Sequence, residues 1–247
     1  MAKNGSGRPP SRSAGDYLKA LYMIGGEGGR VSTGALAARL AIAPASATNM
    51  MKKLAALDPP LVVYSKGRGA ALTGEGRRVA LDRIRRHRLI ERFLADLLGY
   101  EWDEVHEEAE RLEHAVSDRL VDRIAGRLGN PAVDPHGDPI PAKDGTVRPR
   151  AELSLLDLAP GVPAVVSRVP DGDPPVLRAL ADAGVVPGAR LVIAGGKGRG
   201  RSVPLRVGKR GDRRILPGWI AAMVHVIERK NAGAAAVADR NRAGKTS

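Results

Sequence analysis

Apolar residues between about positions 15 and 57 recur every three or four residues, which is the period of an amphipathic helix. The first apolar face consists of Tyr17, Leu18, Leu21, Tyr22 and Ile24. After a glycine-rich turn at 25–29, Ser32 can cap a second helix that carries Leu36, Ala37 and Leu40. A third helix is predicted over 44–57, because proline suits a first helical turn and a Pro-Pro pair follows Asp58.

The pattern then changes to two short β-rich runs, 61–64 and 70–73, which are separated by the turn sequence SKGRG. Three helices followed by a hairpin is the order of a winged helix-turn-helix. Two long helices are predicted next, over 75–98 and about 103–128. Both exceed the usual helix length, which indicates helix pairing within the chain or between chains.

Residues 129–150 contain five prolines and three glycines, so we expect a linker or long loop there. Beyond it, short β-rich runs are separated by glycine and proline turns, with a helix at about 175–183. The predicted strands are 163–169, 189–194, 202–207 and 224–227. The expected fold is mainly α with a small β part: an N-terminal winged helix-turn-helix, a helical domain and a C-terminal SH3-like β-barrel.

Charge and composition narrow the class of partner. The 247 residues include 40 Lys and Arg against 27 Asp and Glu, a net charge of +13 that suits a polyanion. A genome rich in G and C would also favour Arg, Ala and Gly, with no such partner. The few aromatic residues argue against base stacking, and the absence of cysteine excludes thiolate metal sites. Neither a membrane-spanning run nor a signal peptide is found, so we expect a cytoplasmic, nucleoid-associated protein.

The third helix is the candidate reading element, because the second helix of such a pair enters the major groove. Its early polar positions can contact bases, its lysines can contact phosphates, and the wing turn adds two cations. The candidate DNA-binding residues are Pro44, Ser46, Thr48, Asn49, Lys52, Lys53, Lys66 and Arg68. The alternative is a helical bundle whose Lys and Arg are ordinary solvated surface.

Histidines and glutamates cluster on the two long predicted helices. His87 and Glu91 share one helix face, as do His106 and Glu110, because each pair is four residues apart. Glu113 and His114 follow directly. Such oxygen and nitrogen donors favour Mn²⁺, Fe²⁺ or Zn²⁺. A salt-bridged exposed helix would look similar in part, since Glu and Arg alternate through 101–123.

Several motifs resemble the iron- and manganese-dependent repressors of the diphtheria toxin repressor family. They are DYLKALY (16–22), HRLIERFL (87–94), VHEEAERLEHAVSD (105–118), and GNP followed by DPIP within 129–141. The resemblance covers residues 13–141 closely, and 151–228 more loosely resembles the family's SH3-like domain. It implies a homodimer that binds a palindromic operator in double-stranded DNA when it is loaded with divalent metal.

Composition, periodicity and the resemblance together predict a domain arrangement. A mobile N-terminal arm (1–12) precedes the winged helix-turn-helix domain (13–74) and a helical dimerisation and metal-binding domain (75–141). A linker (142–150), the SH3-like domain (151–229) and a mobile C-terminal tail (230–247) follow.

By motif, the resemblance implies two metal sites. The regulatory site consists of Asp16, Glu110, Glu113 and His114. The second site consists of His87, Glu91 and His106, with Asp173 where the SH3-like domain supplies a ligand. Val176 stands at the other such position and cannot bind metal.

The two positions that separate iron from manganese members carry Asp16 and Glu110. Iron-responsive members have Met and Cys there, whereas these two hard carboxylates resemble the manganese branch. Lys19, however, replaces a Glu ligand of the two-domain manganese repressors. We therefore expect a Mn²⁺-dependent repressor of metal-homeostasis genes and not an enzyme. The alternatives are an Fe²⁺-dependent regulator of iron uptake, a Mn²⁺-dependent nuclease and a metal-indifferent nucleoid protein.

Overall fold

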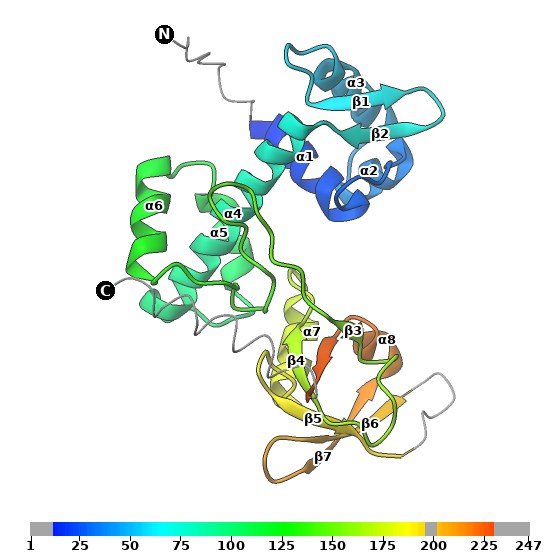
Figure 1. The fold of residues 1–247 in the computed structure, drawn as a ribbon, viewed down its shortest axis with the longest axis vertical. Coiled ribbons are helices and arrows are strands. Elements are labelled where there is room, and N and C mark those ends of the chain that lie inside the picture. The colour runs from blue at the N-terminus through cyan, green and yellow to red at the C-terminus, as the bar shows by residue number, and fades with distance from the viewer. Residues whose placement is uncertain (1–11, 196–201, 230–247) are drawn as a thin grey trace. The chain divides into compact units, whose positions relative to one another are not determined.

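The computed structural model describes residues 12–195 and 202–229 and divides into two compact units (Figure 1). Unit 1 comprises the described residues up to 87 together with 113–116 and 141–147. Unit 2 comprises 88–112, 117–140 and the described residues from 148 onward. The predicted C-terminal arm, and the N-terminal arm apart from Arg12, lie outside the described residues.

Unit 1 contains the predicted three helices and hairpin. The elements are α1 (Arg12–Gly25), α2 (Thr33–Arg39), α3 (Pro44–Ala55), β1 (Val62–Ser65) and β2 (Gly69–Leu72). Ser32 caps α2 as expected, since its hydroxyl accepts a hydrogen bond from the Ala35 amide at 3.1 Å. The two strands pair antiparallel from Val62 opposite Leu72 to Ser65 opposite Gly69. The winged helix-turn-helix fold is therefore confirmed.

The core of this fold explains why α3 is held firmly. Leu18 and Leu21 of α1 pack in one cluster with Leu36 of α2 and with Met51 and Leu54 of α3. All five side chains are at most 2% exposed. Burial of side chains of this size stabilises the fold by about 2 kcal/mol each. The opposite face of α3 is thereby fixed toward solvent.

The two long predicted helices have different outcomes. The first is α4 (Gly74–Leu98). The second, predicted over 103–128, is wrong as a single helix: the chain forms α5 (Val105–Leu112) and α6 (Asp118–Arg127). Ser117 explains the break, because its hydroxyl accepts from the Leu120 amide and so caps α6. Glu113–Val116 form the turn between these helices.

Unit 2 contains a six-stranded sheet in the order β3-β8-β4-β5-β6-β7, in which all neighbours are antiparallel. The strands are β3 (Leu153–Ser154), β4 (Ala164–Arg168), β5 (Arg190–Ile193), β6 (Ser202–Val207), β7 (Asp212–Pro217) and β8 (His225–Glu228). The helices beside them are α7 (Pro174–Asp182) and α8 (Gly218–Ala221). The sequence predicted β4, β5, β6, β8 and α7, but missed β3, β7 and α8.

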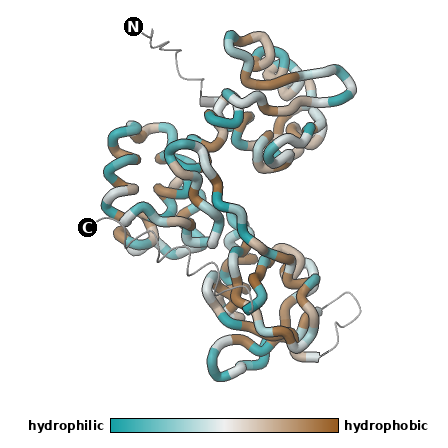
Figure 2. The backbone as a smooth tube through the Cα atoms, in the orientation of Figure 1, coloured by the Kyte–Doolittle hydropathy of each residue, from teal (hydrophilic) through white to brown (hydrophobic). Residues whose placement is uncertain are grey.

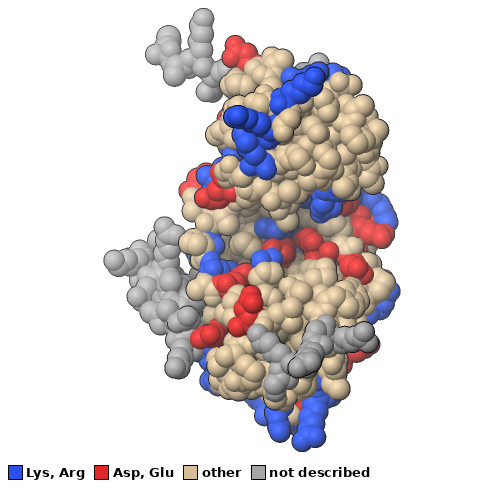
Figure 3. All heavy atoms as spheres, turned by 90° about the vertical axis from the view of Figure 1, so that its right-hand side faces the viewer, with Lys and Arg blue, Asp and Glu red and all other residues tan. Residues whose placement is uncertain are grey.

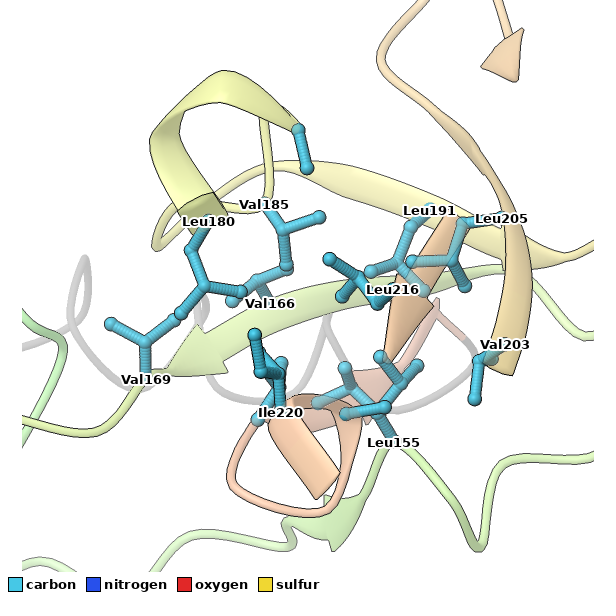
Figure 4. Packing of buried hydrophobic residues seen from close by; sticks show 14 of the residues in the cluster. Leu155, Val166, Val169, Leu180, Val185, Leu191, Val203, Leu205, Leu216 and Ile220 are labelled. Carbon is cyan, nitrogen blue, oxygen red and sulfur yellow. The ribbon is translucent and has the colours of Figure 1, made fainter. Parts of the chain in front are cut away.

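Side chains from both the sheet and its helices converge on one core in this domain (Figure 4). Val166, Leu191 and Leu205 of the strands meet Leu180 of α7 and Ile220 of α8. Along β6 the buried positions alternate with exposed or half-buried ones, while the turn between β6 and β7 is hydrophilic (Figure 2). In the described ranges, no helix is both long and apolar enough to cross a membrane.

Candidate functional site

Three side chains of unit 1 bring potential metal ligands together. Asp16 comes from α1, whereas Glu113 and His114 come from the turn after α5. Each offers one ligand atom, and these atoms all lie within 4.8 Å of one another. His114 Nε2 lies 3.6 Å from Asp16 Oδ1 and 3.6 Å from Glu113 Oε1. The break between α5 and α6 therefore places two candidate ligands opposite α1.

Glu113 is the most buried member of this group, with its side chain 1% exposed. His87 Nδ1 lies 2.6 Å from Glu113 Oε2, and the Lys19 ammonium lies 3.4 Å from the same oxygen. Burial alone raises the pKa of Glu113. The hydrogen bond with His87 and the charges of Lys19, His87 and His114 outweigh it, so this pKa lies below its ordinary value. The carboxylate is thus held ionised in a buried place.

Two atoms of the group are buried without a hydrogen-bond partner among the described residues: Glu113 Oε1 and His114 Nδ1. Buried polar atoms are usually hydrogen-bonded, so a pair of exceptions in one cluster needs an explanation. Two carboxylates and an imidazole are a donor set that suits Mn²⁺, Fe²⁺ or Zn²⁺. The residues present therefore fit a divalent metal ion.

A second group of candidate ligands lies in unit 2 around Glu91 of α4, which is fully buried. His106 Nδ1 of α5 lies 3.1 Å from Glu91 Oε1 and 3.9 Å from Asp171 Oδ2. Asp171 comes from the loop between β4 and α7. Ligand atoms of these three residues lie within 4.8 Å of one another.

Glu91 also lies beside the buried loop residues Asp134 and His136, with ligand atoms again within 4.8 Å. Burial raises the pKa of Asp134 well above its ordinary value, and the charges of Glu91 and Asp138 add to that effect against the opposing charge of Arg88. Arg88 Nε lies 3.3 Å from Asp134 Oδ2. His136 Nδ1 has no hydrogen-bond partner in the described part of the chain. A crowded set of acidic groups around one arginine would gain from a second cation.

Two residues predicted for this second group, Asp173 and His87, have other contacts in the structure. Asp173 caps α7, where its carboxylate accepts a hydrogen bond from the Val176 amide at 3.2 Å. Asp171 lies beside His106 instead. His87 hydrogen bonds Glu113, and Glu110 lies one helical turn after His106 on α5.

Sequence reasoning missed Asp171, Asp134 and His136. The DPHGDP segment at 134–139 carried the only available signal, since an aspartate and a histidine two residues apart interrupt a linker-like stretch. Its backbone turns because the Asp134 carboxylate accepts from the His136 and Asp138 amides.

The predicted DNA-reading residues lie on the solvent side of α3. Ser46, Asn49 and Lys53 are exposed at helical spacing, whereas Ala47, Met51 and Leu54 face the core. The other exposed candidates are Pro44 and Lys52 of α3 and Lys66 and Arg68 of the wing turn. Thr48 differs, because its hydroxyl donates to the Pro44 carbonyl at 2.9 Å. The face of α3 thus offers a hydroxyl, an amide and two ammonium groups to a groove.

Comparison with known proteins decides the family. Residues 11–70 match the model of the iron-dependent repressor N-terminal DNA-binding domain, and 73–142 match the metal-binding and dimerisation domain of the same repressors. Residues 153–228 match the FeoA domain. The chain belongs to the iron-dependent repressor family. It is a metal-dependent transcriptional repressor that binds DNA, dimerises and is not an enzyme, so the nuclease alternative is dropped.

The relatives of this repressor include both iron and manganese regulators. The iron-dependent repressor IdeR of Mycobacterium tuberculosis is 34% identical over 202 residues, which is 76% of this chain and 86% of IdeR. The regulator MntR of Geobacillus kaustophilus is 34% identical over 115 residues, 47% of this chain and 79% of MntR. A solved manganese-dependent transcriptional repressor in complex with manganese is 39% identical, with a TM-score of 0.79 over 87% of this chain and 99% of that one.

Proposed function

We propose that this repressor responds to Mn²⁺ and, as a homodimer, then binds a palindromic operator of metal-homeostasis genes. The observation that carries the proposal is the convergence of Asp16, Glu113 and His114 on one point in unit 1. These hard oxygen donors and one imidazole suit Mn²⁺, and the chain has no cysteine to favour a softer ion. The protein acts in the cytoplasm, at the nucleoid.

At this regulatory site each residue has a separate role. Asp16, Glu113 and His114 bind the ion, and Glu110, assigned to this site by the motif, stays a prediction. His87 holds the Glu113 carboxylate in place through their short hydrogen bond. Such support from outside the ligand set fixes the orientation of a ligand and tunes its basicity. When bound, the ion supplies no chemistry to a substrate but links elements of the protein.

The second site is built on Glu91. His106 and Asp171 are its ligands on one side, and Asp134 and His136 lie on the other. We propose that a cation there relieves the crowding of carboxylates around Arg88 and orders the loop at 134–139. Asp173 and His87, which the resemblance also implies for this site, stay predictions: Asp173 caps α7 and His87 contacts Glu113.

Coupling to DNA follows from where α1 lies. Leu18 and Leu21 of α1 pack directly against Met51 and Leu54 of the reading helix α3. A metal ion that joins Asp16 to the turn at Glu113 would therefore restrict the segment on which α3 rests. Metal favours the arrangement that binds DNA, and by linkage DNA favours the arrangement that binds metal.

The experiment is selection of an inverted-repeat operator and titration of that duplex with purified protein in Mn²⁺, anaerobic Fe²⁺ or chelator at fixed salt, since phosphate binding depends on salt. We expect tight specific binding only with metal, at lower free Mn²⁺ than Fe²⁺. Asp16→Ala removes the metal response, whereas Glu107→Ala, an exposed ion-pair change on α5, retains it. Equal specific binding in chelator would contradict the metal switch.

Fe²⁺ is the second candidate signal, because the IdeR relative spans most of the chain. By resemblance, the iron-responsive members of the family have Met and Cys, two soft ligands, at the positions that carry Asp16 and Glu110 in this chain. In Asp16→Met/Glu110→Cys, we expect the preference to move toward Fe²⁺, since thioether and thiolate sulfur are softer donors. Operator binding that already requires Fe²⁺ in the unaltered protein would keep the repressor but overturn Mn²⁺.

A further inference from the structure

The outward face of the C-terminal part of the sheet carries three arginines, Arg190 of β5, Arg206 of β6 and Arg213 of β7. We call it the arginine face. Along β6, Val203, Leu205 and Val207 are buried, so Arg206 points away from the core. Val192 is opposite Arg206 on one side, and Arg213 is opposite it on the other. The arginines therefore occupy three adjacent strands on one side of the sheet.

This arrangement is electrostatically unfavourable for the protein alone. Arg206 and Arg213 are directly opposite each other, and like charges at such positions destabilise a strand pair. Among residues 12–195 and 202–229, no ion pair is formed by Arg190, Arg206 or Arg213. Asp212, the single acidic residue between 202 and 217, lies 3.8 Å from Arg214 instead. The face thus presents three guanidinium groups that an external anion can bind.

The face is also open and hollowed. A groove of about 550 Å³ is lined by residues that include Val192, Pro204, Arg206, Arg213 and Ile215. Strand β7 is the edge strand of the sheet formed by the described residues. Ile215 is 70% exposed there, which makes it the most exposed of the large apolar side chains that the structure describes. Lys and Arg side chains also lie around the β6–β7 turn, at the bottom of the view in Figure 3.

We propose that the arginine face is a second DNA-binding surface, which contacts phosphates and sugars of duplex DNA independently of sequence. A row of guanidinium groups suits a partner that repeats its negative charge, and their planar forks bind phosphate oxygens in pairs. Ile215 offers an apolar contact to a deoxyribose between phosphates. This surface is additional to α3 and the wing, and its role does not depend on the regulatory metal.

The test uses full-length protein and a random-sequence duplex, with affinity measured by fluorescence anisotropy over a range of salt concentrations. The variant Arg206→Gln/Arg213→Gln removes two phosphate contacts. We expect the slope of log affinity against log salt to become shallower by about 1 per arginine, or about 2 in total. Arg206→Lys/Arg213→Lys should retain most of the slope, because the charge remains.

Two controls separate this effect from loss of charge or loss of folding. Arg178→Gln removes an exposed arginine of the same domain that already pairs with Asp103 at 2.7 Å, and it should leave the slope almost unchanged. Thermal unfolding of the double Gln variant should occur at an equal or higher temperature than in wild type, since a repulsive pair is gone. A lower unfolding temperature together with a lost slope that the Lys variant does not restore would contradict the proposal.

A salt slope in the double Gln variant equal to that of wild type would overturn it. Polyglutamate serves as a probe for an acidic protein partner. If the double Gln variant no longer binds polyglutamate but binds DNA as wild type does, the proposal is overturned and the face is assigned to such a partner. Failure of the proposed function looks different. Metal-independent operator binding in wild type would refute the metal switch, while the comparison of salt slopes on random DNA would remain valid.

Discussion

Glu113 combines two properties that rarely occur together, almost complete burial and a lowered pKa. Burial penalises the charged form, so its ionisation depends on the groups around it. His87 and Lys19 both face Oε2, while Oε1 lies toward His114. The carboxylate is therefore ready to bind a cation without first losing a proton. A metal ion at this position must, however, share Glu113 with the Lys19 ammonium.

Changing Lys19→Gln should strengthen metal binding at the regulatory site. The substitution removes a positive charge 3.4 Å from Oε2 of the proposed ligand Glu113 and keeps a polar side chain of similar length. We expect Mn²⁺ to bind about fivefold more tightly, a gain of ~1 kcal/mol, because Lys19 is partly exposed and can turn toward solvent. Equilibrium dialysis over a series of Mn²⁺ concentrations measures this affinity. Lys52→Gln on α3 is the matched control, and weaker metal binding in Lys19→Gln would show that Lys19 supports the site.

Glu152 provides a residue-scale test that is independent of metal. Burial raises its pKa, but hydrogen bonds from Ser167 and Arg168 and the charges of Arg168 and Arg150 outweigh this, so the pKa is lowered. Its stabilising effect is therefore complete above the unfolded-state pKa and is lost as the pH falls through the folded-state pKa. Glu152→Gln should cost about 2 kcal/mol at neutral pH and much less in acid. Urea unfolding at both pH values checks this, and an equal cost at both would refute it.

At the scale of elements, predictability followed the strength of the periodic pattern. Helices α1 to α4 and strand β6 have a regular apolar face, and each lies where that pattern predicts. Strand β7 has only Leu216 buried among six residues, so no alternation marks it, and pairing with β6 defines it instead. The break between α5 and α6 was missed for a different reason, since helix periodicity continues across it and only the cap at Ser117 reveals it.

That cap predicts the effect of Ser117→Ala. Loss of the hydrogen bond to the Leu120 amide should destabilise α6 by about 1 kcal/mol. The turn at Glu113 and His114 precedes the cap directly, so we also expect weaker Mn²⁺ binding. Ser117→Asp, which retains a capping oxygen, should restore both properties. Thermal unfolding and Mn²⁺ titration of the two variants test this. A Mn²⁺ affinity that is unchanged in both variants would show that the cap does not support the metal site.

At the scale of the whole molecule, the sequence predicted the nature of the candidate site better than its members. The clustered histidines and glutamates of the long helices indicated metal ligands, and Glu113 and His114 do meet Asp16. Asp171, Asp134 and His136 could not be predicted in the same way, because loops bring them to Glu91 and no helical spacing links them. Contacts made by irregular backbone depend on the tertiary fold and leave little trace in periodicity.

The last prediction concerns reciprocity between metal and DNA. If Mn²⁺ tightens operator binding by a given factor, the operator must tighten Mn²⁺ binding by the same factor, because both routes lead to the same complex. Such couplings are about 5-fold to 150-fold. Isothermal titration of Mn²⁺ into the protein with and without operator, beside operator titrations with and without Mn²⁺, gives the two factors independently.

Asp16→Ala should bring both close to one, since it removes the ligand on α1, whereas Glu107→Ala should leave both unchanged. Two factors that differ beyond error in the unaltered protein would show a further linked equilibrium, such as dimerisation. A factor of one for both would mean that the metal site and the reading helix are not coupled.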